Sequence, residues 1–109
     1  MSTQQVYKAL ADPTRRQILK LLQEGELPAG EIAEQFTMTW PSVSRHLGIL
    51  ADAGLVAVRR DGQHLQYSLT TSVLTDIVTE LADIVHFSRS EQPATEGPSA
   101  TRALARRFQ

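Results

Sequence analysis

The fold is decided by residues 39–54, which read TWPSVSRHLGILADAG. The apolar positions of this stretch recur at the spacing of a helix that packs on one side, and they are Val43, Leu47 and Leu50. Thr39 is a favourable N-cap residue, a proline is tolerated in the first turn, and Gly54 is a typical C-terminal stop. We therefore predict a helix from about Trp40 to Ala53.

Three shorter helices are predicted before this stretch. The first runs from about Gln4 to Ala11. The dipeptide Asp12-Pro13 begins the second, because an aspartate caps a helix well and proline fits its first position. Gly25 ends the second helix, and a third runs from about Pro28 to Phe36. A short break then leads into the helix described above.

The period of the apolar residues changes to two after that helix. Two alternating runs, 56–59 and 65–69, flank Asp61-Gly62, a strong hairpin signal because both residues tolerate turn positions with positive φ. From Thr70 to Ser88 the spacing is helical again and predicts a long last helix. We expect residues 1–88 to form one domain and residues 89–109 to form a flexible C-terminal tail, since Ser, Glu, Pro, Thr and Gly follow there.

This order of elements predicts a mainly α protein with a β-hairpin wing, which is a winged helix-turn-helix. A short helix, a tight turn and a longer second helix are what is needed to lay that second helix in a major groove. A hairpin directly after it can flank the contact and reach along the phosphate backbone. Duplex DNA is therefore the expected partner.

Polar side chains gather where such a protein would meet DNA. The predicted DNA-contacting residues lie in the N-terminal half of the second helix and around the hairpin tip, and they are Thr39, Trp40, Ser42, Ser44, Arg45, His46, Arg59, Arg60, Gln63 and His64. Arg45 either pairs with guanine edges or clamps a phosphate. Trp40 either stacks on the sugar-phosphate surface or covers the turn, and His46 either contacts DNA or is a buried structural histidine. The alternative explanation for these residues is that they form an ordinary solvated face. For the charged residues of the hairpin, the alternative is that their charges protect edge strands from pairing with other chains.

Arg15 and Arg16 fall in the first turn of the second predicted helix. Cations at that end oppose the helix dipole, which is mildly unfavourable. We interpret the pair either as a hint of a phosphate partner or as ordinary surface variation.

A set of short segments carries a family resemblance. They are Ala9–Leu19 (ALADPTRRQIL), Glu31-Ile32-Ala33, Pro41–Leu47 (PSVSRHL) with Leu50, Ala53–Val56 (AGLV), Arg59–Gly62 (RRDG) and Tyr67-Ser68-Leu69. Over about residues 6–87 the chain resembles the ArsR-type, or arsenic-repressor-like, winged-helix repressors. The resemblance implies a homodimer joined by its first and last helices, which binds an inverted-repeat operator and represses transcription.

The predicted last helix favours a dimer independently of the resemblance. Its apolar stripe is long for a small domain, and pairing with a twofold mate would bury it. The alternative is that the stripe packs only on its own domain. The predicted dimerisation residues come from the first and last helices, and they are Val6, Leu10, Leu74, Ile77, Val78, Leu81, Ile84 and Val85.

The sequence has no cysteine, which excludes thiolate metal sites, disulfides and a cysteine nucleophile. The resemblance implies that metal-sensing relatives use either cysteines on the third helix or an Asp-x-His with a later His/Glu pair, and both patterns are absent. The last helix offers Asp76, Glu80, Asp83 and His86, which either hold a weak divalent ion across a dimer or form a solvated polar face. We therefore expect neither a metal nor a cofactor, as in a metal-independent branch of the ArsR-type family. The sequence does not indicate the inducing signal.

Composition sets the remaining limits. The 109 residues are 41% hydrophobic and 21% charged, which is ordinary for one globular domain. No run approaches the roughly 18 apolar residues of a membrane span. Residues Met1–Gln5 lack the basic cluster and apolar stretch of a signal peptide. We expect no membrane association and a cytoplasmic location.

Two other functions compete with DNA binding. An enzyme is disfavoured, because Ser44, His46 and Asp52 cannot face one another on a single helix and no phosphate-binding glycine loop is present. A winged-helix module that binds another protein is favoured by the net charge of -1. Salt dependence separates the two binding functions, since phosphate neutralisation makes duplex binding fall steeply as salt rises.

Overall fold

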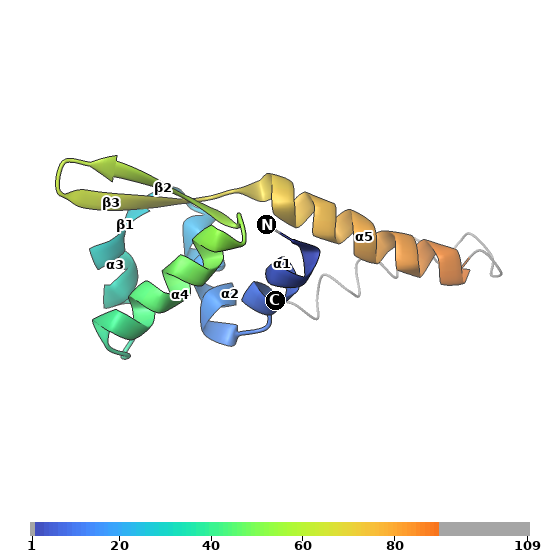
Figure 1. Ribbon diagram of the computed structural model, residues 1–109, viewed down its shortest axis with the longest axis horizontal. Helices are drawn as coiled ribbons and strands as arrows, with labels where there is room; N and C mark the ends of the chain where they lie inside the picture. Colours follow the sequence, from blue (N-terminus) through green and yellow to red (C-terminus); the bar gives the residue numbers. More distant parts are fainter. Residues whose placement is uncertain (1, 90–109) are drawn as a thin grey trace. The chain divides into compact units, whose positions relative to one another are not determined.

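The computed structural model describes residues 2–89 (Figure 1). Its elements are α1 (Thr3–Leu10), α2 (Pro13–Leu22), β1 (Leu27–Pro28), α3 (Ala29–Glu34), α4 (Trp40–Asp52), β2 (Val56–Asp61), β3 (His64–Leu69) and α5 (Thr71–Arg89). This order confirms the predicted winged helix-turn-helix. The chain divides after Leu74 into two units, so most of α5 is described by itself. The predicted tail lies outside the described residues, except for Arg89, which ends α5.

The helix starts follow from local capping chemistry. Ser2 and Gln5 form a capping box at the start of α1, each side chain bonding to the other residue's backbone N–H at 3.2 Å. Asp12 caps α2 as predicted, its Oδ2 accepting from the N–H of Arg15 at 3.1 Å. Thr39 is the N-cap residue of α4 in its backbone, but its hydroxyl donates to Ser42 Oγ instead of capping the helix.

A third strand, absent from the prediction, changes the start of α3. Leu27 and Pro28 form β1, which pairs antiparallel with Tyr67 and Gln66 of β3, so the sheet order is β1-β3-β2. Pro28 therefore lies in an edge strand, where its missing N–H costs no ladder bond. The predicted helix from Pro28 to Phe36 is shortened at both ends to Ala29–Glu34.

The hairpin turn sits one residue later than predicted. Asp61 is the last residue of β2 and pairs with His64, which leaves Gly62 and Gln63 as the two turn residues. Gly62 has φ +65°, and no non-glycine residue in the described chain has positive φ. A two-residue hairpin turn requires positive φ at its first position, and glycine takes that backbone conformation without a steric cost.

The core lies between α2, α3, α4 and the base of the hairpin. Its largest fully buried side chains are Ile18, Ile32, Val43, Leu47, Leu50 and Leu55. The predicted alternation in the hairpin is buried only near the base, where Val56 is 4% and Tyr67 is 9% exposed. Val58, directly opposite Tyr67, is already 45% exposed, and Leu65 nearer the turn is 38% exposed, so burial is lost from this pair outward. No helix within residues 2–89 is both long and apolar enough to span a bilayer.

Candidate nucleic-acid interface

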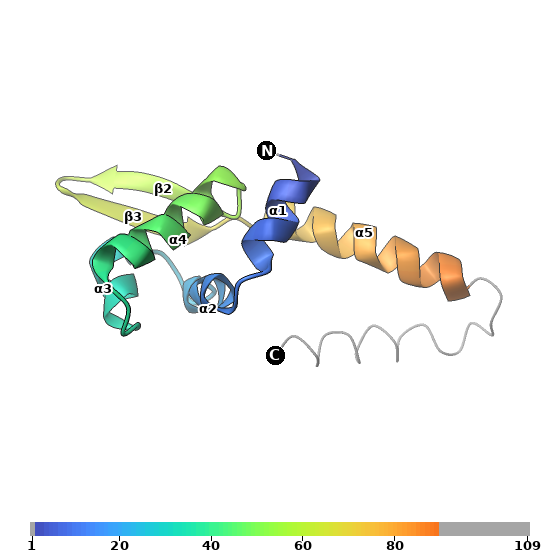
Figure 2. The ribbon, with the colours of Figure 1, turned by 60° about the horizontal axis from the view of Figure 1, so that its bottom comes forward.

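Helices α3 and α4 form the helix-turn-helix, with residues 35–39 between them (Figure 2). The face of α4 that carries Val43, Leu47 and Leu50 is fully buried. The N-terminal half of α4 therefore presents its other residues to solvent. Ser42, Ser44 and Arg45 are exposed, and Trp40 is 51% exposed. This is the face that a recognition helix presents to a major groove.

His46 differs from the other residues predicted on this face. Its side chain is only 17% exposed, and its Nδ1 lies 3.2 Å from Nη1 of Arg15 and 3.9 Å from Oδ2 of Asp12. Arginine has only donors, so a hydrogen bond between them requires His46 Nδ1 to be the acceptor. The structure thus gives His46 partners inside its own domain, and its contact with DNA stays a prediction.

Asp12 has two roles at this junction. It caps α2 and it lies beside both His46 and Arg15. Partial burial tends to raise the pKa of Asp12, but the backbone N–H groups of Arg15 and Thr14 and the charge of the Arg15 guanidinium outweigh it, and the pKa lies below its ordinary value. The carboxylate therefore stays charged at neutral pH.

Arg15 and Arg16 have a structural explanation that the sequence did not reveal. Arg15 Nε donates to the carbonyl of Ala9 at 2.7 Å, and Arg16 Nη1 donates to the carbonyl of Leu10 at 2.7 Å. These are the last carbonyls of α1, which have no partner within their own helix. Cations also suit the negative C-terminal end of a helix. The unfavourable interaction of the two cations with the dipole of α2 is thus offset by their hydrogen bonds to the end of α1. No phosphate partner is needed to explain the pair.

The two wing arginines point to opposite faces of the hairpin. Arg59 pairs with Gln66 across the strands and Arg60 with Leu65. Directly opposed residues share a face and successive residues alternate, so Arg60 shares the face of Val56 and Tyr67. Arg60, Gln63 and His64 are all exposed, and no ion pair involves Arg60 within residues 2–89.

Arg59 is held by Glu26, a residue that the sequence reasoning missed. Arg59 Nε lies 3.2 Å from Glu26 Oε2, and Nη2 donates to Oε1. The hydrogen bond from Arg59 holds the pKa of Glu26 below its ordinary value, and the same contact raises the pKa of Arg59. Glu26 directly precedes β1, so recognising that strand would have placed it beside the wing. One of the two predicted wing cations is therefore already paired.

Comparison with known proteins decides the family. Residues 12–58 match the family described as "Bacterial regulatory protein, arsR family". The transcriptional repressor SdpR of Bacillus subtilis is 46% identical over 81 residues, which cover 74% of this chain and 90% of SdpR. The chain belongs to the ArsR family. It is a winged helix-turn-helix transcriptional regulator, and proteins of this family bind DNA.

Further relatives agree with this assignment. The arsenical resistance operon repressor of Staphylococcus aureus is 40% identical over 76 residues, covering 70% of this chain and 73% of that protein. The crystal structure of an ArsR family transcriptional regulator matches with a TM-score of 0.76 at 30% identity. That match covers 80% of this chain and 90% of the other. The resemblance noted from the sequence is thereby confirmed, together with the fold that it implies.

The residues predicted to join an ArsR-type dimer differ in exposure within the single chain. Val6 is 3% and Ile77 is 7% exposed, so both are already buried. Leu10, Leu74, Leu81 and Val85 are half-buried. Val78 and Ile84 of α5 remain 64% and 62% exposed, respectively. Apolar surface is thus available on α5 rather than on the buried part of α1.

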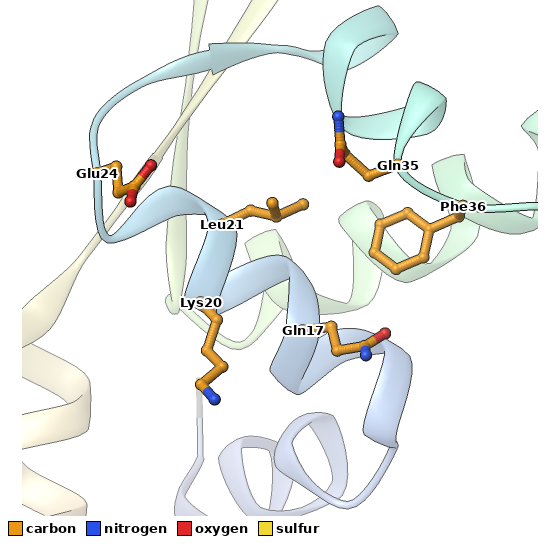
Figure 3. Close-up of a pocket in the computed structure, with 6 residues that line it drawn as sticks. All are labelled: Gln17, Lys20, Leu21, Glu24, Gln35 and Phe36. Carbon is orange, nitrogen blue, oxygen red and sulfur yellow. The ribbon is translucent and has the colours of Figure 1, made fainter. Parts of the chain in front are cut away.

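A metal centre and an enclosed ligand pocket are two other kinds of site that could serve an ArsR-family chain. Within residues 2–89, no three histidine or acidic side chains gather in a way that could hold a metal ion. An open depression of ≈ 320 Å³ lies between α2 and the end of α3. Figure 3 shows Leu21 and Phe36 beside Gln17, Lys20, Glu24 and Gln35 around it. This mixed, open lining lacks the enclosed apolar walls that usually bind a small ligand.

The unequal partners of the wing arginines give a testable difference. Arg60→Ala is expected to lower the slope of log affinity against log salt by about 0.9, which corresponds to one lost phosphate contact. Arg59→Ala should lower the slope less, because Glu26 already neutralises that cation. The measurement is duplex binding by fluorescence anisotropy at several salt concentrations.

Glu26→Gln is the matched variant for the same experiment. It removes the charge that holds Arg59, so it should raise duplex affinity and steepen the salt dependence. Equal losses from Arg59→Ala and Arg60→Ala would contradict this expectation, because they would show that Arg59 leaves Glu26 for a phosphate.

Proposed function

We propose that this ArsR-family chain is a homodimeric repressor that binds an inverted-repeat operator through α4 and its wing. The observation that carries the proposal is the two-sided nature of α4. Its inner face is fully buried, while Ser42, Ser44 and Arg45 are exposed on the part that follows the turn. Repression is suggested by SdpR and the arsenical resistance relative, which are both named as repressors.

The proposed dimer rests on the apolar residues of α5. Ile77 and Ile84 lie two helical turns apart on the same face, yet Ile77 is 7% exposed and Ile84 is 62% exposed. The apolar stripe of α5 therefore continues from a buried residue to an exposed one, and a second apolar surface is needed to cover the exposed part. A second α5 related by twofold symmetry supplies one with the same length and the same residues.

We also propose that the chain acts without a metal. A relative from Streptomyces lividans is named as a probable mercury resistance operon repressor, and mercury and arsenic are ions that thiolates bind well. This sequence contains no cysteine. Its response must therefore come from a signal other than thiolate coordination.

The test is a titration of the protein onto the DNA upstream of its own gene and onto scrambled DNA of equal length. Fluorescence anisotropy at two salt concentrations measures both affinities. The proposal predicts tight, salt-sensitive binding that prefers the upstream DNA. Failure to bind either duplex at low salt would remove DNA as the partner and favour a protein partner.

Arg45 is the residue most directly tested in this assay. It is exposed beside Ser44 on the outer face of α4, and no ion pair holds it within residues 2–89. Arg45→Ala is expected to cost about 1–3 kcal/mol on the operator and to relax the preference at one base position. Arg45→Lys should not restore that preference, because lysine cannot make the paired contact to a guanine edge. Equal losses on operator and scrambled DNA would reduce Arg45 to a phosphate contact.

A further inference from the structure

The side chain of Arg15 joins three helices of the unit that ends at Leu74. Arg15 lies in the first turn of α2, where its own N–H donates to the Asp12 cap. Its Nε donates to the carbonyl of Ala9 at 2.7 Å and its Nη2 to the carbonyl of Lys8 at 2.9 Å, both at the end of α1. Its Nη1 bonds to His46 Nδ1 at 3.2 Å, in the middle of α4.

The geometry of the guanidinium makes this contact restrictive. Its donors stand in a rigid plane, so the carbonyls of α1 and the ring of His46 must keep a fixed relation to one another. The contact also requires an acceptor at His46 Nδ1, since the guanidinium group has only donors. With its side chain 17% exposed, the ring is largely shielded from water that would otherwise replace the bond.

We propose that Arg15 is a positioning residue for sequence reading, which holds α4 through His46 in one placement relative to α1. His46 directly follows Arg45, so a shift of the ring moves the side chain that we propose reads a base. Arg15 thus connects the end of α1 to the recognition helix. This inference rests on the proposed function, because it requires α4 to read DNA.

The neighbouring Arg16 provides a matched control. It lies in the same turn of α2, carries the same charge, and also donates to a carbonyl of α1, that of Leu10. Among the hydrogen bonds of residues 2–89, only Arg15 of the pair reaches α4. Arg15→Gln and Arg16→Gln remove equal charge. Arg15→Gln removes two bonds to α1 carbonyls where Arg16→Gln removes one, and only Arg15→Gln removes the bond to His46.

The experiment measures the ratio of affinity for the upstream DNA to affinity for scrambled DNA. The full chain is used at one salt concentration, at a temperature where circular dichroism shows each variant folded. Arg15→Gln should lower the ratio roughly tenfold, within the usual range of coupling between sites, while Arg16→Gln changes it less than about twofold. An unchanged ratio in Arg15→Gln, or an equal fall in Arg16→Gln, would overturn the proposal.

A second pair of variants tests the same contact from the other side. His46→Asn keeps an acceptor near the position of Nδ1, whereas His46→Leu removes it. Asparagine should preserve the ratio and leucine should lower it, and Arg15→Gln combined with His46→Leu should lose no more than either change alone. Equal losses from asparagine and leucine, or additive losses in the double variant, would contradict the proposed contact.

The two proposals fail in distinguishable ways. If the unaltered protein shows no preference for its upstream DNA, the proposed function is wrong and the role of Arg15 falls with it. If the unaltered protein discriminates but the variants of Arg15 and His46 do so equally well, only the positioning role is wrong.

Discussion

Leu47→Ala is expected to destabilise the domain by about 2–5 kcal/mol, the usual cost of removing a buried leucine side chain together with the cavity that it leaves. Leu47 is fully buried in the middle of α4. A small domain has only about 5–15 kcal/mol of stability in total, so this one change consumes a large share of it. Urea unfolding followed by circular dichroism measures the loss as a lower midpoint.

Leu65→Ala is the matched control for this prediction. The substitution is the same, but Leu65 lies in the outer hairpin and is 38% exposed, so its loss should cost less than about 1 kcal/mol. The variant at Leu47 should lose DNA binding in proportion to its unfolded fraction and recover it on cooling. A midpoint equal to that of Leu65→Ala would show that the core does not hold α4 in place.

The elements that the sequence predicted well are those set by local signals. Asp12 followed by proline, and the regular spacing around Leu47, each specify a helix without reference to distant residues. The hairpin was also predictable, since glycine and alternating apolar residues lie close together in the chain. The predicted turn lies one residue too early. The prediction treats Asp61 as a turn residue that tolerates positive φ, whereas of Asp61 and Gly62 only Gly62 has positive φ.

The features that sequence reasoning missed depend on contacts between distant residues. Strand β1 has only two residues and therefore no periodicity, and it exists because β3 offers it a partner. The pairing of Glu26 with Arg59 follows from that strand and spans 33 positions of the chain. Local patterns likewise could not show that Arg15 reaches His46, 31 positions away. These contacts show which of the predicted polar residues already have partners within residues 2–89.

Ile84→Glu is expected to have the largest effect on function. In the proposed dimer Ile84 is covered by the partner's α5, and a carboxylate there would lose its hydration without gaining a counter-charge. Light scattering should then report a monomer. Operator affinity should fall by roughly 10²- to 10⁴-fold, the advantage that joining two binding modules provides. Binding to scrambled DNA should fall much less, since phosphate contacts of a single domain remain.

Thr79→Glu is the matched control on the same helix. It adds the same charge at an exposed position about 140° around α5 from Ile84, where 100° separates successive residues. That variant should stay dimeric and keep its operator preference. A dimeric Ile84→Glu protein would place the seam elsewhere and leave the 62% exposure of Ile84 without an explanation from dimerisation. A monomeric Ile84→Glu protein that still preferred its operator would instead separate sequence reading from dimerisation, and would assign the discrimination to α4 of one chain alone.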